Sequence, residues 1–406
     1  MKLSHNTVFF YLLTIVNGLI PLVTISFISR TVTSEQLGIY LLSFTIMNVL
    51  GLIIDFGFTI SGVRFLKTIN KKIPETIFVS TTFFIKFFIF CVVFILYFVF
   101  YISHSHGEVI FFLITIIGAL FTGLDSIWIL QANNRLIQIV KNNLYSNLIY
   151  VISVLSVVIF YKNIYYILWM FVIYKFYIFL ISFREVRAIY AITYKGIHKE
   201  EVITVLKSTY GVAIFRIFAL SYTSANGIFL NYLTNKYQVA LFLAFEKINK
   251  AILFIATPIS QALLPYFSEK SNKKKLTLYI LFIICFCSLG LIVGNIFARD
   301  VVGVFMGRSY LSQNTGELFF FMTIITPFIL VSNAIGMLYI IPQKLDKALN
   351  IIVISTSVIN TLLVFNFVNS SSDGALQMAK VIALSEFFVM SLMIIVMFIH
   401  GRKRGK

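Results

Sequence analysis

Ten ionisable side chains lie within long apolar stretches of the sequence. They are Asp55, Lys86, Asp125, Lys175, Arg216, Glu246, Lys247, Lys250, Lys380 and Glu386. Charge is costly in apolar surroundings, so such groups usually face a partner, a polar cavity or a ligand. Arg216 lies about 10 Å inside its stretch at a helical rise of 1.5 Å per residue. Glu246 is placed to pair with Lys250 one helical turn on, so it can neutralise only one of the two lysines nearby.

The two halves of the chain carry different balances of these charges. In the first half two lysines offset two aspartates, whereas the second half sets four cations against two glutamates. A surplus of buried positive charge requires water or an anionic ligand. The sequence therefore predicts a central cavity that binds an anion, with its strongest positive field in the second half. The candidate substrate-binding residues are Arg216, Lys247, Lys250, Lys86 and Lys175, and a structural role fits the last two equally well.

Long apolar helices must position these charges. Of the 406 residues, 59% are hydrophobic and only 12% are charged, and the mean hydropathy is +0.95. Soluble domains are about a quarter charged, so a water-soluble globule is excluded. Lipid forbids unpaired backbone, so each apolar run is predicted to be a helix. The predicted spans are 8–28, 37–62, 77–102, 109–130, 144–160, 164–183, 209–231, 238–264, 276–297, 316–340, 349–366 and 376–399. The expected fold class is an all-α polytopic membrane protein with about 12 transmembrane helices.

The lysines and arginines test this layout. With both termini in the cytoplasm, the cytoplasmic segments carry 22 of the 33 basic residues and the outer loops carry 5. This alternating bias is the positive-inside signal of a multi-pass membrane protein. The net charge of +18 is thus explained by orientation against anionic lipid, and nucleic acid is not expected as a partner. The first run is full length, so it is predicted to be a span and not a cleaved signal peptide.

The longest hydrophilic stretch divides the chain into two lobes of six helices. The expected organisation is an N-terminal lobe at 1–183, a cytoplasmic linker at 184–208, a C-terminal lobe at 209–399 and a basic cytoplasmic tail at 400–406. A short similarity supports this division, because QLGIYL at 36–41 opens the second span and QVALFL at 238–243 opens the eighth. Six crossings per lobe predict parallel repeats around a central cavity, related by an axis along the membrane normal.

Signals for catalysis or a cofactor are missing from the sequence. It has no G-x-x-x-x-G-K-[ST] phosphate loop, and no paired carboxylates or Ser/His/Asp set stands out in a loop. The three cysteines have no CxxC spacing, so neither a disulfide framework nor a zinc site is indicated. His104 and His106 share an outer loop without further metal ligands. Neither catalytic residues, nor a metal site, nor a cofactor is expected.

Several short segments resemble a known family when they are taken together and in order. They are Arg30-Thr31-Val32, Leu37-Gly38-Ile39-Tyr40, Asp55-Phe56-Gly57-Phe58, Ile127-Trp128-Ile129-Leu130-Gln131, the stretch from Asn249 through Pro258 to Pro265, and Met306-Gly307-Arg308-Ser309-Tyr310. On a twelve-span layout they resemble the polysaccharide transporters of the bacterial O-antigen flippase family. That family lies within the superfamily of multidrug, oligosaccharidyl-lipid and polysaccharide exporters.

The resemblance implies a non-catalytic flippase of the bacterial inner membrane. Its substrate would be an oligosaccharide repeat unit on undecaprenyl diphosphate, moved from the cytoplasmic to the periplasmic leaflet by alternating access. Cationic cavity residues would meet the diphosphate, since Lys and Arg bind phosphate directly. The resemblance also implies ion coupling, for which the candidates are Glu246, Glu386 and Asp55. Besides membrane lipid, a polysaccharide polymerase and a chain-length regulator are the expected partners.

Two alternatives remain open from the sequence. A multidrug-type, cation-coupled exporter would share the fold, but it would favour acids in its cavity to hold cationic drugs. A membrane-embedded glycan enzyme would fit the composition, but it should show large catalytic outer loops. The longest outer loop, residues 298–315, contains no evident catalytic cluster. The sequence does not identify the sugars, the coupling ion, the oligomeric state, or whether the glycan is O-antigen or capsule.

Overall fold

The computed structural model describes a chain built from helices. The described residues are 18, 20, 22–67, 73–104, 109–193, 197–269, 273–311, 314–343, 345–369 and 373–403, and none of these lies in a β-strand. Ten of their helices are long and apolar enough to cross a membrane. The chain is therefore an all-α, multi-pass membrane protein, as predicted.

Ten of the twelve predicted spans correspond to these helices. Of the first predicted span, 8–28, only residues 18, 20 and 22–28 are described, and each of these is helical. The eighth, 238–264, is part of the 34-residue helix α11 (Lys236–Glu269), which is not among the ten. This helix has Glu246, Lys247 and Lys250 near its middle, so its apolar character is interrupted. The side chains of 254–266, which include most of the Asn249–Pro265 motif, lie outside the described residues, as do Ser105 and His106.

The chain forms two compact units. Unit 1 contains the described residues of Ser43–Leu220, and unit 2 contains those of Thr14–Leu42 and Ser221–Lys406. Residues 22–42 thus pack with the second unit. Helix continues to Ile189 and resumes at Lys199, so much of the segment expected as a linker, 184–208, is helical.

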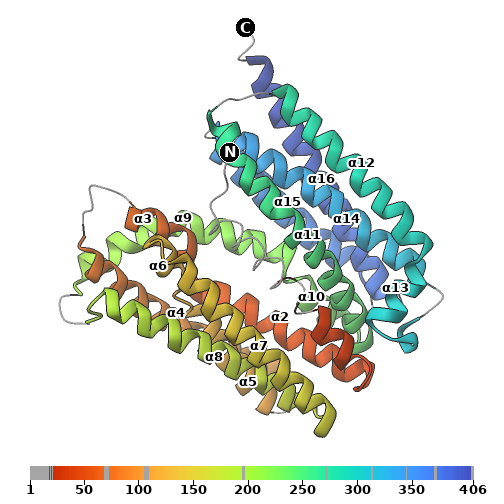
Figure 1. The fold of residues 1–406 in the computed structure, drawn as a ribbon, viewed down its shortest axis with the longest axis horizontal. Coiled ribbons are helices and arrows are strands. Elements are labelled where there is room, and N and C mark those ends of the chain that lie inside the picture. Colours follow the sequence, from red (N-terminus) through yellow and green to blue (C-terminus); the bar gives the residue numbers. More distant parts are fainter. Residues whose placement is uncertain are drawn as a thin grey trace. The chain divides into compact units, whose positions relative to one another are not determined.

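Unit 1 is built mainly from α3 to α9 and the end of α2 (Figure 1). The helices are α2 (Ser34–Asp55), α3 (Phe58–Lys67), α4 (Glu75–His104), α5 (Val109–Gly123), α6 (Ile127–Ala132), α7 (Leu136–Phe160), α8 (Ile164–Ile189) and α9 (Lys199–Thr223). Helices α5 and α7 pack on α8, and α3 packs on α6. Phe58, Phe78 and Trp128 are buried in one apolar core at these contacts, which therefore contains two of the sequence motifs, 55–58 and 127–131.

Tyr190, at the end of α8, ties three segments of unit 1 together. Its hydroxyl donates to Glu75 Oε2 at 2.6 Å and receives the Asn133 amide at 3.1 Å. Burial, reinforced by the Glu75 carboxylate, raises the pKa of Tyr190 to about 12. The phenol therefore stays protonated, and keeps its donor to Glu75, further into alkaline pH than an ordinary tyrosine would.

Unit 2 contains the remaining helices together with residues 22–42. They are α10 (Asn226–Leu233), α11, α12 (Lys273–Ile296), α13 (Ala298–Phe305), the short turn η1 (Arg308–Tyr310), α14 (Thr315–Ile335), the π-helical turn η2 (Gly336–Ile340), α15 (Asp346–Phe367) and α16 (Gly374–Lys403). Figure 1 shows α12, α14, α15 and α16 running alongside one another, and α14 contacts α11, α12 and α16.

The first turns of α2 are fastened within unit 2. A Cβ atom added to Gly38 would lie 2.2 Å from the carbonyl oxygen of Lys236, so only glycine permits this close approach of α2 to α11. Nearby, Arg30 Nη2 donates to the carbonyl of Val304 at 2.6 Å, in the last turn of α13. A cation bonded there satisfies a helix-end carbonyl that has no partner within its own helix.

Candidate functional site

A break in the helical backbone positions the first member of the site. Helix α2 ends at Asp55, and the next two residues, Phe56 and Gly57, have positive φ angles of 50° and 80°. The chain then resumes as α3, where Thr59 donates to Asp55 Oδ2 from its hydroxyl at 2.8 Å and from its backbone N–H at 3.3 Å. The Asp55 carboxylate thereby caps the start of α3 and is fixed between two helices.

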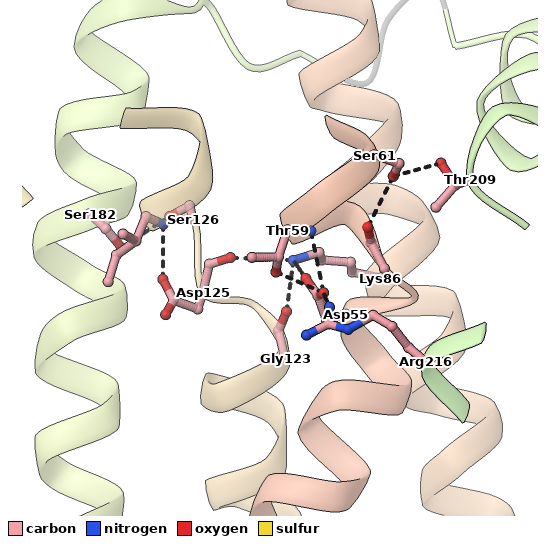
Figure 2. Close-up of polar contacts among 12 residues, drawn as sticks. Asp55, Thr59, Ser61, Lys86, Gly123, Asp125, Ser126, Ser182, Thr209 and Arg216 are labelled. Carbon is pink, nitrogen blue, oxygen red and sulfur yellow. Dashed lines mark hydrogen bonds and ion pairs between the residues drawn. The ribbon is translucent and has the colours of Figure 1, made fainter. Parts of the chain in front are cut away.

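Lys86 of α4 lies against this carboxylate in a fully buried position. Its ammonium is 2.8 Å from Asp55 Oδ1, 2.9 Å from the carbonyl of Gly123 and 3.3 Å from the carbonyl of Asp125 (Figure 2). An ammonium has three hydrogens, and here each has an acceptor. With only 1% of its surface exposed, Lys86 has no donor left for a substrate, although the sequence marked it as a candidate.

Arg216 of α9 takes the second oxygen of the same carboxylate. Its Nη1 is 2.5 Å from Asp55 Oδ2, and 20% of its side chain is exposed. A guanidinium has five N–H donors, and this bond uses one or two of them at a single nitrogen. The charge balance drawn from sequence counted Arg216 as an excess cation of the second half. The structure instead groups it in unit 1 and pairs it with Asp55.

Asp125 and Lys175 are the remaining charges of unit 1's spans. Asp125 follows the end of α5, and its Oδ1 accepts the backbone N–H of Ile127, the first residue of α6, at 2.9 Å. The adjacent Ser126 donates to Ser182 of α8 at 3.0 Å, as Figure 2 shows. Lys175 of α8 lies over the ring of Phe171, with its nitrogen 5.5 Å from the ring centroid. Together with the Asp55 group, unit 1's spans hold three cations against two carboxylates, one positive charge in surplus.

The candidate charges of unit 2 are arranged differently. Lys250 pairs with Glu246 at 2.9 Å across one turn of α11, and the two side chains are 37% and 14% exposed. Lys247 is half-buried on the same helix. Lys380 pairs with Glu317 of α14 at 2.7 Å, and both side chains are well exposed. In the described part of unit 2, both of these ion pairs therefore lie at partly or well exposed positions.

Unit 2 also contains a buried network of uncharged polar groups. Asn360 of α15 donates to Asn226 Oδ1 at 3.0 Å and accepts from the Ser385 hydroxyl at 3.1 Å. All three are at most 2% exposed. Glu386, next to Ser385 on α16, is 6% exposed and has Tyr222 as an electrostatic neighbour. One member of this network, Ser385, therefore lies next to one of the ion-coupling candidates on α16.

Several members of these sites were not among the sequence candidates. Thr59 carries a detectable signal, because a hydroxyl four residues after an aspartate is placed to bond it across a helix start. The carbonyls of Gly123 and Asp125 carry none, because every residue has a carbonyl. No cluster of three or more His, Cys, Asp or Glu residues that could hold a metal occurs within the described ranges.

The fold is that of a multi-pass transporter. It is similar to a structure of the lipid II flippase MurJ in an inward closed conformation, with a TM-score of 0.71, 15% identity, and coverage of 97% of this chain and 86% of that one. It is also similar to a multidrug resistance MATE transporter of the MOP superfamily, in an inward-facing conformation (TM-score 0.65, 13% identity, 100% and 95% coverage) and an outward-facing one (0.59, 14%, 98% and 95%).

The family of the chain is shown by its amino-acid sequence. The model for the family described as polysaccharide biosynthesis protein matches residues 3–271, and the chain belongs to that family. No sequence among curated proteins matches the chain. The proteins in these similar structures are a flippase and a transporter.

Proposed function

We propose that this protein is a flippase for undecaprenyl-diphosphate-linked oligosaccharide repeat units of O-antigen or a related surface polysaccharide. It would move them from the cytoplasmic to the periplasmic leaflet of a bacterial inner membrane, with both termini cytoplasmic. The family assignment and the MurJ-like fold support a lipid-linked substrate. A polysaccharide polymerase and a chain-length regulator would act downstream.

One observation carries the proposal at the level of the site. Arg216 lies within a predicted span, is partly exposed, and pairs with Asp55 through a single nitrogen. An arginine with spare donors suits a diphosphate, because its planar fork matches two phosphate oxygens at once. Lys175, Lys247 and Lys250 are the further cations that would face the anionic linker. We do not include Lys86 among the substrate-binding cations, because its three N–H donors are taken by Asp55 and two backbone carbonyls.

Glu386 is the favoured coupling residue of this proposal. It lies deep within α16 beside the Asn226–Asn360–Ser385 network, with 6% of its surface exposed. A carboxylate in such a place can gain or lose a proton or a cation as access to water changes. Asp55 is less suited, because it already holds two cations. Glu246 is less suited because it is paired with Lys250.

The test is reconstitution of the full chain into liposomes that carry a lipid-linked oligosaccharide. Exposure of the sugar on the opposite leaflet is followed by lectin binding. Wild type should accelerate this exposure, and Arg216→Ala should slow it about tenfold or more, because a hydrogen bond to a charged group contributes about 1.5–3 kcal/mol. Arg299→Ala, at an exposed position on α13, is the matched control and should transport as wild type does.

A multidrug-type exporter is the second candidate, because MATE transporters share the fold. The same liposomes distinguish the two. If wild type exports a lipophilic cation but does not accelerate the flipping of the lipid-linked oligosaccharide, the protein is an exporter and the flippase proposal is wrong. Unchanged flipping by Arg216→Ala would remove this residue from the site.

A further inference from the structure

We propose that Lys86 is a positioning residue that leaves Arg216 available to an anion by holding the shared Asp55 carboxylate. This inference rests on the proposed diphosphate substrate. It concerns two residues whose functions the fold alone does not assign. Lys86 itself makes no contact with the substrate and acts through Asp55.

The geometry around Asp55 is a carboxylate shared by two cations. Oδ1 accepts from Lys86 at 2.8 Å, and Oδ2 accepts from Arg216 at 2.5 Å and from the Thr59 hydroxyl at 2.8 Å. The three charged residues come from α2, α4 and α9 (Figure 2). Because one negative charge faces two positive charges, the group as a whole keeps one positive charge.

Lys86 and Arg216 differ in how deeply they are buried, and this gives them different roles. Lys86 is 1% exposed and its three donors are satisfied by Asp55 and two carbonyls, whereas 20% of the Arg216 side chain is exposed. The surplus charge can therefore meet an incoming anion only at Arg216. The buried Lys86 offsets the negative charge of Asp55, and the partly exposed Arg216 is the cation that an anion can reach.

The loss of Lys86 changes the state of Arg216 without touching it. Asp55 would then have one cation, and the Asp55–Arg216 pair would be neutral and tightly closed in a setting of low polarity. An anion would then have to compete for the Arg216 guanidinium with an Asp55 carboxylate whose charge Lys86 no longer offsets. If Asp55 is also neutralised, the guanidinium is released again, so the effect of Lys86 depends on Asp55.

This dependence can be measured as a double-mutant cycle. The full chain is purified in detergent as wild type, Lys86→Met, Asp55→Asn, the double variant and Arg216→Ala. Inorganic pyrophosphate is titrated calorimetrically into each, and thermal unfolding of the same samples gives the folded fraction. We expect Lys86→Met to weaken pyrophosphate binding about tenfold or more. In the Asp55→Asn background the same change should alter the affinity by less than about threefold.

The outcomes separate this inference from the function on which it rests. If Lys86→Met is folded and binds pyrophosphate as wild type does, or if its loss is equally large in the Asp55→Asn background, Lys86 has no role through Asp55. If wild type and Arg216→Ala bind pyrophosphate equally, the diphosphate site itself is wrong. If Lys86→Met does not fold, Lys86→Gln removes the charge but keeps a hydrogen-bond donor for the Gly123 carbonyl, and the same affinities are expected.

Discussion

The two units of the molecule hold their helices together with different chemistry. In unit 1 a buried carboxylate is shared by two cations from other helices, with partners 31 and 161 residues away in sequence. In unit 2 the buried connections between α10, α15 and α16 are made by amides and a hydroxyl. The ion pairs Glu246–Lys250 and Glu317–Lys380 of unit 2 lie instead at partly or well exposed positions.

This difference determines how each unit is affected when one of its buried polar groups is lost. A buried ion group is strongly destabilised when one member is removed, because the remaining charge is left in an apolar setting. When one member of the amide network is removed, only neutral hydrogen bonds are lost, and no charge is left unpaired. Under the proposed function, the Asp55 group of unit 1 would hold a fixed charge toward the anion, and the amide network of unit 2 would adjoin Glu386, the residue whose charge would change.

The largest expected effect comes from removing the shared carboxylate. Asp55→Ala leaves Lys86 buried with no counter-charge, which should lower the free energy of unfolding by about 3–5 kcal/mol. Thermal unfolding of the purified protein measures this loss. Glu317→Ala, which breaks the exposed pair with Lys380, is the control and should change stability by less than about 1 kcal/mol. Equal effects of the two changes would contradict the contrast between buried and exposed pairs.

The second effect is expected in the amide network of unit 2. Asn360→Leu removes the partner of both Asn226 and Ser385, and should cost about 2 kcal/mol because buried polar groups are left unsatisfied. Asn366→Leu on the same helix is the control, since that exposed amide bonds only the carbonyl of Leu362. A loss as large as that of Asp55→Ala would show that charge does not distinguish the two units.

The third effect tests the backbone break that presents Asp55. Gly57→Ala places a Cβ in a left-handed conformation, 3.0 Å from Val212 Cγ1 and 3.2 Å from the Ala213 nitrogen, and should cost about 1 kcal/mol. Gly211→Ala is a matched control within α9, because its Cβ would meet nothing within 4 Å. The control should be neutral or slightly stabilising, since alanine favours a helix. Denaturation in detergent compares the two variants.

The smallest effect on stability is expected at the partly exposed pair of α11. Lys250→Gln breaks an i,i+4 pair to Glu246, which should change the free energy of unfolding by less than about 0.5 kcal/mol. Any fall in pyrophosphate affinity of this variant can then be assigned to the lost charge. A destabilisation of 2 kcal/mol or more would place this pair with the buried ion group of unit 1.

Apolar length and the distribution of lysines were enough to predict the fold class and most of the helices. They did not predict that residues 22–42 pack with the second unit, because the sequence pattern of a span does not specify its neighbours. They also did not predict where the second span divides. The Asp55-Phe56-Gly57-Phe58 motif marked the place, but nothing in its composition states that two successive residues adopt positive φ.

The sequence identified the residues of the candidate site but not which of them pair with one another. Asp55, Lys86 and Arg216 were each singled out as charges within apolar helices. Arg216 was assigned to the second half because it follows the hydrophilic stretch, yet its partner lies 161 residues earlier. Two of the three acceptors of Lys86 are backbone carbonyls, which only the folded chain brings to the ammonium. Side-chain type indicated where charge is buried, and tertiary structure decided which charge remains accessible.

Helix α2 begins among residues of unit 2 and ends in unit 1, immediately before the break at Phe56. The carboxylate that Lys86 and Arg216 share therefore lies at the very end of a helix. A shift of that end by about 1.5 Å, the rise of one residue, would change the 2.8 Å distance to Lys86 and the 2.5 Å distance to Arg216 together.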